Sequence, residues 1–439
     1  MFPNPQDALP VPPRPNLEQY RKLAKELVKA AKSAEPDAIR VWAGRWINRL
    51  VKLSRLEITP QMPVEIEHWA RQVNEFARRR LAERCTLAEA QFVIARVSGF
   101  ESWPRLAKYI QGLGHATSDV ARFEQAADAI VAGDLRTLQR LLRQAPELVR
   151  LRSAREHRST LLHYVSANGV EGYRQKTPKN AVQIAETLLK AGAEIDAEAD
   201  VYGGGATPLG LTATSCHPEA AGVQEQLLQL LLDHGAVIEQ PQEGKGRGAV
   251  IGCLANGRGR AAEFLARRGA KLDLEGAAGV GWLDAVRSFF YPDGRLKAGA
   301  TQEQMKDGFT WACEFGHTSV VDFLLQHGIK LDARLRHHGQ TGLHWAAYGG
   351  HADTVKLLLE RKASVNIKDE TYGGTPLGWA LYAWGEAPNR GRYYEVVALL
   401  VKAGGTEEPE WLADTHRGSP LMARIQADPK MVAALRGEI

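Results

Sequence analysis

The chain has 439 residues, of which 44% are hydrophobic and 24% are charged, an ordinary composition for a folded protein. Because a single compact core stops growing at about 250–300 residues, the chain forms either several domains or a repeat array. No stretch approaches the roughly 20 apolar residues of a membrane span, and the first residues lack the basic and apolar regions of a secretory signal. The sequence therefore predicts a cytoplasmic protein.

Cysteine usage and charge narrow the functional classes further. The four cysteines are scattered and form no Cys-x-x-Cys pair, so neither a disulfide framework nor a zinc site is predicted. The formal net charge is +5, and residues 1–120 hold 19 Lys and Arg against 13 Asp and Glu. A basic front part of this kind can meet acidic proteins, nucleic acid or anionic surfaces.

The first 115 residues contain no repeated phrase. Residues 1–15 are rich in proline and carry no apolar run, so we expect them to be disordered. Residues 16–115 are predicted to form a basic helical module, because apolar side chains recur there at the 3.6-residue period of a helix. The predicted helices cover residues 17–33, 37–50, 63–82 and 86–98, with a further helix after the stop at Gly99.

Two of these helices begin with capping residues. Asp37 fits the N-cap or first turn of the second helix, and Thr86 followed three residues later by Glu89 has the pattern of a capping box. The short link at 112–118 favours docking of the module on the part of the chain that follows. A module that swings freely remains the alternative.

A 34-residue repeat follows from about residue 121. Gly316-His317 and Gly350-His351 lie 34 residues apart, and each is followed by a run rich in Leu and Val. Each unit closes eleven residues after its histidine, at Gly328 and at Lys362. Spacing kept to the residue indicates a true internal repeat.

The repeated units begin with a shared phrase. It occurs as Thr207-Pro208-Leu209-Gly210, Thr341-Gly342-Leu343-His344-Trp345-Ala346-Ala347 and Thr375-Pro376-Leu377-Gly378-Trp379-Ala380. These residues resemble the ankyrin repeat, whose signature is Thr-Pro-Leu-His-x-Ala at a period near 33. The resemblance implies an all-α fold class: an ankyrin-repeat α-solenoid of helix-turn-helix units with short β-hairpin or loop connections.

Elementary physical chemistry supports the same units. Threonine suits a helix N-cap, and proline at the first helical position has no N–H to lose. The Leu-rich second helix presents an apolar stripe that only the next unit covers. A glycine then supplies the left-handed conformation that ends the helix. Such glycines are predicted at Gly192, Gly235, Gly269, Gly328 and Gly404.

The array is expected to span residues 121–439, with about seven units and a C-terminal cap. The units start near residues 121, 156, 203, 246, 306, 339 and 373, and the cap covers about 415–439. An insert is expected near 274–305. The preceding helical module is similar to a segment that precedes ankyrin arrays in many bacterial proteins, which implies a bacterial origin and no particular activity.

Histidines and glycine loops invite catalytic or ligand-binding interpretations that their context does not favour. In ankyrin-like repeats, residues such as His344 bond the capping threonine, and His317 and His351 sit at the turn between helices. The Gly-rich segment 244–248 lacks the preceding strand and the Gly-Lys-Ser/Thr ending of a phosphate loop. With no Ser/His/Asp set or carboxylate pair, the sequence predicts a protein that is not an enzyme, without catalytic residues, cofactor or metal.

The inner face of such an array is not needed for stacking, so a ligand is expected there. The predicted inner-helix residues are Asn256, Glu314, Phe315, Tyr348 and Tyr382, with Trp384 just beyond. The hairpin tips add Arg334, Arg336, Lys368 and Tyr372. Because aromatic side chains dominate interface energetics, the predicted function is a scaffold that binds an unidentified protein ligand in this concave groove. An insert folded over the groove would bury some of these residues.

The alternative is nucleic-acid or anionic-surface binding through the basic helical module. Its densest basic patch is Arg78-Arg79-Arg80 with Arg84. Such a run at a helix end is more often a solvated face. Exposed aromatic residues among the cations, or a recognisable helix-turn-helix, would indicate nucleic-acid binding, whereas Trp42, Trp46 and Trp69 have the spacing of core residues.

Overall fold

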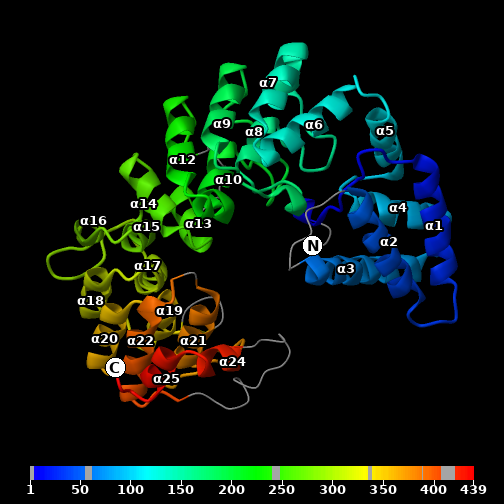
Figure 1. Cartoon of the computed structure of the whole chain (residues 1–439). Helices are drawn as coiled ribbons and strands as arrows, with labels where there is room; N and C mark the ends of the chain where they lie inside the picture. The colour runs from blue at the N-terminus through cyan, green and yellow to red at the C-terminus, as the bar shows by residue number, and fades with distance from the viewer. Residues whose placement is uncertain (1–3, 55–61, 240–247, 335–338, 388, 407–420) are drawn as a thin grey trace. The chain divides into compact units, whose positions relative to one another are not determined.

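The computed structural model describes residues 4–54, 62–239, 248–334, 339–387, 389–406 and 421–439 (Figure 1). Helices dominate, and the described residues contain no β-strand. Isolated bridges join Arg152 to Thr160, Ala199 to Ala206 and Phe290 to Leu296. No described helix is long and apolar enough to cross a membrane. The chain divides into two compact units, Met1–Gln240 and Pro241–Ile439, which we call the first and second unit.

Five α-helices open the first unit, as the sequence predicts. They are α1 (Leu17–Ala31), α2 (Ala38–Ser54), α3 (Met62–Glu83), α4 (Leu87–Val97) and α5 (Trp103–Leu113). Capping residues define several of these starts. The Asn16 side chain accepts the Glu18 N–H at 2.8 Å before α1, and Thr86 accepts the Glu89 N–H at 3.2 Å before α4. Asp37 directly precedes α2.

The apolar faces of these helices form one core. Trp42 and Trp46 are buried on α2 with ring centroids 5.3 Å apart, and Trp69 packs on the edge of the core as a half-buried residue. Ile94 and Leu106 are fully buried. The tryptophans of the module therefore serve the core, as their spacing predicts.

The proline-rich start is more ordered than the sequence suggests. A short 3-10 helix η1 (Pro5–Asp7) precedes Leu9, whose side chain is 1% exposed. The Leu9 N–H donates to the Val97 carbonyl at 2.8 Å. Disorder, expected over residues 1–15, therefore does not describe this segment. Leu9 and its buried neighbours Ala8, Pro10 and Pro12 anchor the segment through contacts with distant parts of the chain, which no local sequence pattern predicts.

Helix pairs follow in the first unit. They are α6 (Asp119–Ala132) with α7 (Leu135–Gln144), α8 (Leu161–Val165) with α9 (Ala181–Lys190), and α10 (Pro208–Thr214) with α12 (Gln224–Asp233). The short helices η2 (Pro146–Arg150), η3 (Gly172–Arg174) and α11 (Cys216–Ala220) occupy the connections. Successive first helices contact one another, α6 with α8 and α8 with α10.

A cluster of buried charges joins the helical module to these pairs. We call it the buried charged cluster: Glu124, Arg155, His157, Glu171 and Arg174. Arg155 Nε lies 2.6 Å from Glu171 Oε1, and Arg155 Nη1 donates to the Ser98 carbonyl at 2.8 Å. Although burial opposes ionisation, Arg155 and Arg174 hold the pKa of Glu171 well below its usual range. The module is thus docked on the repeats, the arrangement that the short link favours.

The second unit consists of further helix pairs. They are α13 (Ala249–Ala255) with α14 (Gly259–Arg267), α15 (Leu274–Gly279) with α16 (Leu283–Ser288), α17 (Gln302–Glu314) with α18 (Thr318–Gln326), α19 (Gly342–Gly349) with α20 (Ala352–Glu360), α21 (Pro376–Glu386) with α22 (Gly391–Lys402), and α24 (Leu421–Gln426) with α25 (Pro429–Leu435). Their apolar faces share a core that includes Phe309, Leu324, Leu358 and Trp384.

The segment treated as an insert in the sequence contains one of these pairs. Helix α15 contacts both α13 and α17, the position of a first helix in the stack. All six of its residues are buried and four of them are Gly or Ala, and a Cβ on Gly279 would collide with Leu254 of α13. Gly308 of α17 likewise approaches the backbone of α15 closely. Small side chains allow this short helix pair to pack in the stack, although it lacks the Thr-Pro-Leu-His start of other units.

The helix ends follow the predicted chemistry. All five predicted stop glycines adopt positive φ angles, between 88° and 99°. Lys362 takes the same place with φ of 69°, a conformation that L-residues adopt at a cost. Thr207 and Thr375 cap α10 and α21 by accepting the N–H of the third helical residue, at 3.3 Å in both cases. The Gly-rich segment 244–248 lies outside the described residues except for Gly248.

Candidate functional site

The inner helices of the second unit place equivalent side chains in rows. Helix α17 packs on α19, and α19 packs on α21. Because the units repeat every 34 residues, equivalent positions on these helices line up. One row consists of Trp311, Trp345 and Trp379, and the other of Glu314, Tyr348 and Tyr382.

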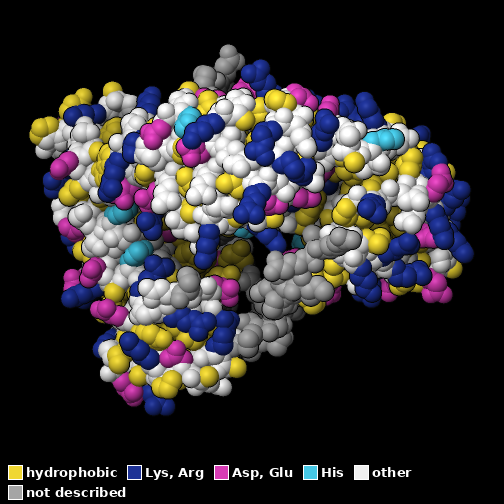
Figure 2. Space-filling view, turned by 45° about the horizontal axis from the view of Figure 1, so that its top comes forward, with side chains coloured by type: hydrophobic (Ala, Val, Ile, Leu, Met, Phe, Trp, Pro, Cys, Tyr) yellow, Lys and Arg dark blue, Asp and Glu magenta, His cyan; other side chains and the backbone are white. Residues whose placement is uncertain are grey.

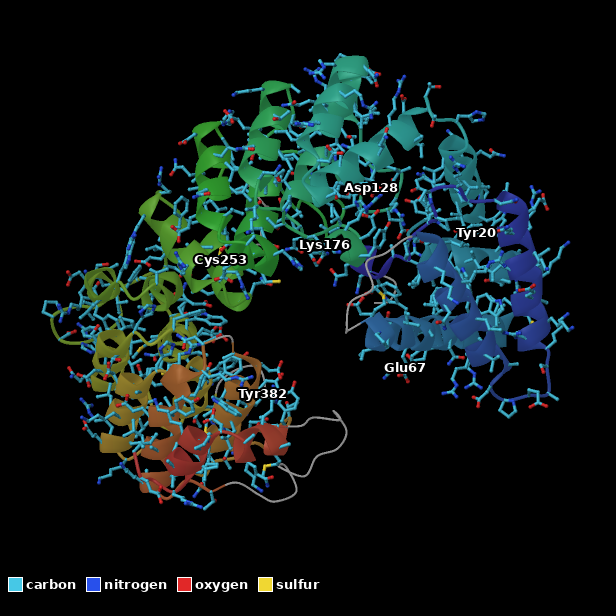
Figure 3. All side chains as sticks on the ribbon, in the orientation of Figure 1. Tyr20, Glu67, Asp128, Lys176, Cys253 and Tyr382 are labelled. Atoms are coloured by element: carbon cyan, nitrogen blue, oxygen red, sulfur yellow. The ribbon has the colours of Figure 1, made fainter. Side chains whose placement is uncertain are left out.

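Five aromatic residues from these rows and from an adjoining loop form a continuous patch. We call it the aromatic surface: Trp345, Tyr348, Tyr372, Trp379 and Tyr382. Trp379 lies at its centre, with ring centroids 5.4 Å from Trp345, 5.6 Å from Tyr348 and 6.3 Å from Tyr372, all edge to face. Tyr372 is 57% exposed and Tyr382, which projects from α21 in Figure 3, is 37% exposed. The other three are half-buried.

A buried carboxylate fixes the central ring. Asp369 Oδ2 accepts the indole N–H of Trp379 at 3.0 Å and the backbone N–H of Gly374 at 2.9 Å. Its Oδ1 accepts the N–H groups of Thr371 and Tyr372. Burial opposes ionisation, but these donors outweigh it and lower the pKa of Asp369. The loop and the Trp379 ring are therefore held in one geometry before any ligand arrives.

Two polar groups at this face lack partners among the described residues. The indole N–H of Trp345 is buried without an acceptor. Glu314 Oε2 on α17 is also buried and unbonded, and burial raises the pKa of this carboxyl to about 7. Buried polar groups without hydrogen bonds cost about 1–3 kcal/mol each, and both of these groups lie beside the exposed rings.

The predicted hairpin-tip residues surround the aromatic surface unevenly. Arg334 Nη1 donates to the carbonyls of Gly339 and Lys368, each at 3.0 Å, and lies 3.6 Å from Glu370 Oε1. Arg334 therefore ties two successive tips together, while the Lys368 side chain is exposed. Arg336, another predicted tip residue, lies outside the described residues.

Three other predicted groove residues have different surroundings. Asn256 is exposed, and its Nδ2 donates to the Gly252 carbonyl at 2.9 Å. Phe315 is half-buried against Gly259, where a Cβ would lie 2.7 Å from the ring. Trp384 is fully buried, which corrects its placement beside the groove. Because α21 continues to Glu386, Trp384 falls on the core stripe that starts at Leu377.

Trp345 and Trp379 were absent from the predicted groove. The signal was in the repeated phrase, where both occupy the variable position x of Thr-Pro-Leu-His-x-Ala. The helical period places that position one turn before Tyr348 and Tyr382, hence on the same face. A search for side chains at this position would have found the centre of the aromatic surface.

The histidines of the repeated units make hydrogen bonds within the fold. His344 Nδ1 contacts Thr341 Oγ1 at 2.9 Å, and burial lowers the pKa of this histidine to about 4. His317 and His351 place Nε2 at 3.0 and 2.8 Å from the carbonyls of Gly279 and Glu314. Within the part of the chain that the structure describes, no group of three or more His, Cys, Asp or Glu residues could hold a metal ion.

The basic patch of the helical module is partly committed to packing. Arg80 Nε donates to Glu89 at 2.8 Å, and its guanidinium lies over the Phe92 ring at 4.8 Å. Arg78 donates to the Pro36 carbonyl. On the face shown in Figure 2, Lys and Arg side chains are scattered among Asp and Glu. These observations give the nucleic-acid alternative little structural support.

The comparison with family models agrees with the repeat assignment in the second unit. A family model of ankyrin repeats in three copies matches residues 277–369 and 309–408. The crystal structure of the human ASB11 ankyrin repeat domain is similar at 21% identity, covering 64% of this chain and 99% of that chain with a TM-score of 0.33. No curated protein matches the sequence. The predicted fold class, all-α with ankyrin repeats after a helical module, is confirmed.

Proposed function

We propose that this chain is a non-catalytic scaffold that holds a partner protein on the aromatic surface of its second unit. Ankyrin repeats generally mediate protein–protein interaction, and residues 277–408 carry them. The observation that supports this site is the cluster around Trp379, where fixed rings lie beside exposed Tyr372 and Tyr382. Tyrosine and tryptophan supply most of the binding energy at protein interfaces.

The chemistry of the surface suggests how the partner would be held. Apolar side chains of the partner would cover the exposed rings of Tyr372 and Tyr382. A cationic group would suit Glu314, whose buried carboxyl has no cation beside it among the described residues. Lys368 and Glu370 at the rim would add specificity more than affinity, because exposed charges contribute little.

Affinity capture with the full chain tests this proposal. The variant Tyr348→Ala/Tyr382→Ala is expected to lose the captured partner, with an affinity loss of at least about tenfold. The matched control is Tyr291→Ala, which removes a tyrosine that is 45% exposed elsewhere in the second unit. Phe315 is left intact because it packs on Gly259. A partner retained equally by both variants would contradict the proposal.

The basic helical module remains the site of the alternative function, nucleic-acid or anionic-surface binding. A salt titration separates the two, because contacts to phosphates weaken steeply with salt. Capture dominated by nucleic acid and abolished at high salt would move the function to that module. A bacterial origin and a cytoplasmic location stay predictions from the sequence.

A further inference from the structure

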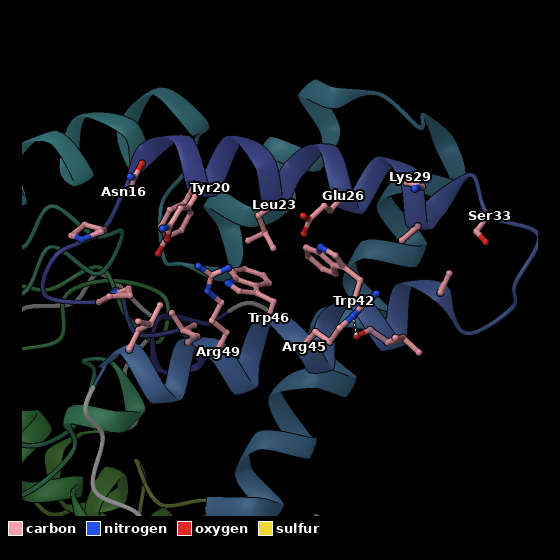
Figure 4. Close-up of a pocket in the computed structure, with 18 of the residues that line it drawn as sticks. Asn16, Tyr20, Leu23, Glu26, Lys29, Ser33, Trp42, Arg45, Trp46 and Arg49 are labelled. Carbon is pink, nitrogen blue, oxygen red and sulfur yellow. Dashed lines mark hydrogen bonds between the residues drawn. The ribbon is translucent and has the colours of Figure 1, made fainter.

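A cleft of about 1500 Å³ runs between α1 and α2 of the helical module (Figure 4). Its floor is apolar and aromatic, with Tyr20 and Leu23 of α1 facing Trp42 and Trp46 of α2. Three of these four side chains are buried against the core of the module and Leu23 is half-buried, so the floor is firmly supported. This cleft shares no residue with the aromatic surface of the second unit.

The α2 wall of the cleft is one row of side chains at four-residue intervals: Val41, Arg45, Arg49 and Leu53. Residues spaced in this way lie on one face of a helix. Val41 and Leu53 at the two ends are 51% and 46% exposed, unusually so for aliphatic residues. Arg45 and Arg49 lie between them in the sequence, and Figure 4 shows both arginines on the same side of the helix.

Charge on the cleft is unbalanced. Arg45 and Arg49 make no ion pair with any carboxylate of the described residues. Five cationic residues line the cleft (Arg14, Lys29, Lys32, Arg45 and Arg49) against three acidic ones. Glu26 lies 3.9 Å from Lys22 and Asp37 lies 4.0 Å from Arg40, both cations outside the cleft, and Glu35 makes no ion pair among the described residues. The α2 wall therefore presents two guanidinium groups to anything that enters.

The floor also contains an unsatisfied donor. The indole N–H of Trp42 has no acceptor among the described residues. Because Trp42 is only 4% exposed, this N–H is also shielded from solvent.

We propose that this cleft binds an acidic amphipathic helix of a partner protein. Its apolar stripe would lie on Leu23, Val41 and Leu53, above the buried rings of Trp42 and Trp46, and its acidic flank would face Arg45 and Arg49. A helix satisfies its own backbone, whereas an extended peptide would find no backbone partners between two helices. Helices α1 and α2 contain 15 and 17 residues, which at 1.5 Å per residue accommodates about four turns. This inference does not depend on the proposed function.

The direct test uses a designed peptide and the full chain. A fluorescein-labelled peptide of about four helical turns carries Leu at i, i+3, i+4 and i+7 with Glu beside the stripe, and its binding is followed by anisotropy. Two control peptides keep the length, one with Lys in place of Glu and one with the same composition scrambled. The acidic amphipathic peptide is expected to bind at least about tenfold more tightly than either control.

Variants then locate the binding. Arg45→Glu/Arg49→Glu is expected to weaken the acidic peptide at least about tenfold, and Val41→Asp/Leu53→Asp to do the same. The matched control Arg71→Glu/Arg79→Glu makes the same charge change on exposed positions of α3 outside the cleft, and should change affinity by less than about twofold. Far-UV circular dichroism checks that each variant folds.

Several outcomes would overturn the inference. The acidic peptide could fail to bind, could bind no better than the scrambled or Lys peptide, or could respond equally to the α2 and α3 variants. Single-stranded DNA and anionic lipid vesicles are assayed in parallel. If these ligands bind through Arg45 and Arg49 and the peptide does not, the cleft recognises phosphate rather than a protein helix.

Discussion

The two units gather charged and aromatic residues in opposite ways. In the first unit, Arg155 and Glu171 are 1% and 0% exposed on their side chains and lie within ion-pair distance of each other. In the second unit, the aromatic surface is partly exposed, and the buried carboxyl of Glu314 has no cation beside it among the described residues. Each charge of the first cluster has a counter-charge in the same chain, although Arg155 Nε, His157 Nε2 and Glu171 Oε2 make no hydrogen bond among the described residues. The second would be completed by another molecule.

A structural site and a binding site therefore differ in whether their charged groups have counter-charges, and not in the residue types that they contain. Both regions contain Tyr, Glu and Arg, and both perturb pKa values. The buried charged cluster holds η3, the helical module and the first helix pairs together through Arg174 and Arg155. We therefore assign a structural role to a group whose pKa is perturbed and whose counter-charge is present, and a ligand-binding role to such a group without a counter-charge.

The largest effect is expected from breaking the buried charged cluster. Arg155→Ala would leave the Glu171 carboxylate buried without its nearest cation and two carbonyls without their donor. Removing one partner of a buried pair typically costs about 3–5 kcal/mol. Urea unfolding followed by far-UV circular dichroism should show a strongly lowered midpoint. Arg158→Ala, at an exposed neighbour, should shift it by less than about 0.5 kcal/mol. Equal shifts for both variants would show that the cluster contributes no more than a surface arginine.

An intermediate and pH-dependent effect is expected at Glu314. Its pKa in the folded protein is about 7 because burial favours the neutral acid, against an ordinary value of 4.5. A raised folded pKa makes the wild type lose stability as pH rises from the unfolded value through the folded one. Glu314→Gln does not titrate, so its stability relative to wild type should increase by about 2 kcal/mol between pH 5 and pH 8.

The measurement for Glu314→Gln is the urea midpoint at both pH values. Glu360→Gln, on the exposed side of α20, is the control and should show no such change. A Glu314→Gln advantage that stays constant with pH would mean that the carboxyl is not held neutral by burial.

The smallest effect tests the backbone alone. Lys362 ends α20 with φ of 69°, where the equivalent positions of other units carry glycine. Lys362→Gly should stabilise the second unit by about 0.5–1 kcal/mol, since glycine adopts this conformation without steric cost. The reciprocal change Gly328→Ala, at φ of 99°, should destabilise it by a similar amount. Thermal unfolding monitors both, and a destabilised Lys362→Gly variant would contradict the strain argument.

The fold was predictable where local chemistry repeats. Thr375 before Pro376 and the glycine stops identify helix pairs because caps and left-handed ends depend on a few adjacent residues. The pair α15 and α16 was not found, since its glycines and alanines act through close approach to α13 and α17. The order of the N-terminal segment depends on Leu9 meeting Val97, and such distant contacts leave no local pattern.

The candidate site was predictable in part. The 34-residue spacing places Tyr348 and Tyr382 on the inner helices, and in the structure these two tyrosines lie close to each other. The sequence could not show how far α21 extends. Because α21 continues to Glu386, Trp384 lies on its core-facing side. Nor could the sequence show that Glu314 lacks a cation, because partnership across units is a property of the packed chain.

The segment around Leu9 has a consequence for how the protein is made. Its carbonyl accepts from Arg155, which in turn pairs with Glu171. During synthesis Leu9 leaves the ribosome long before Arg155 and Glu171. The helical module therefore cannot complete the contacts around Leu9 until the second helix pair has emerged. Nascent chains arrested before and after Glu171 should therefore differ sharply in the resistance of the module to protease.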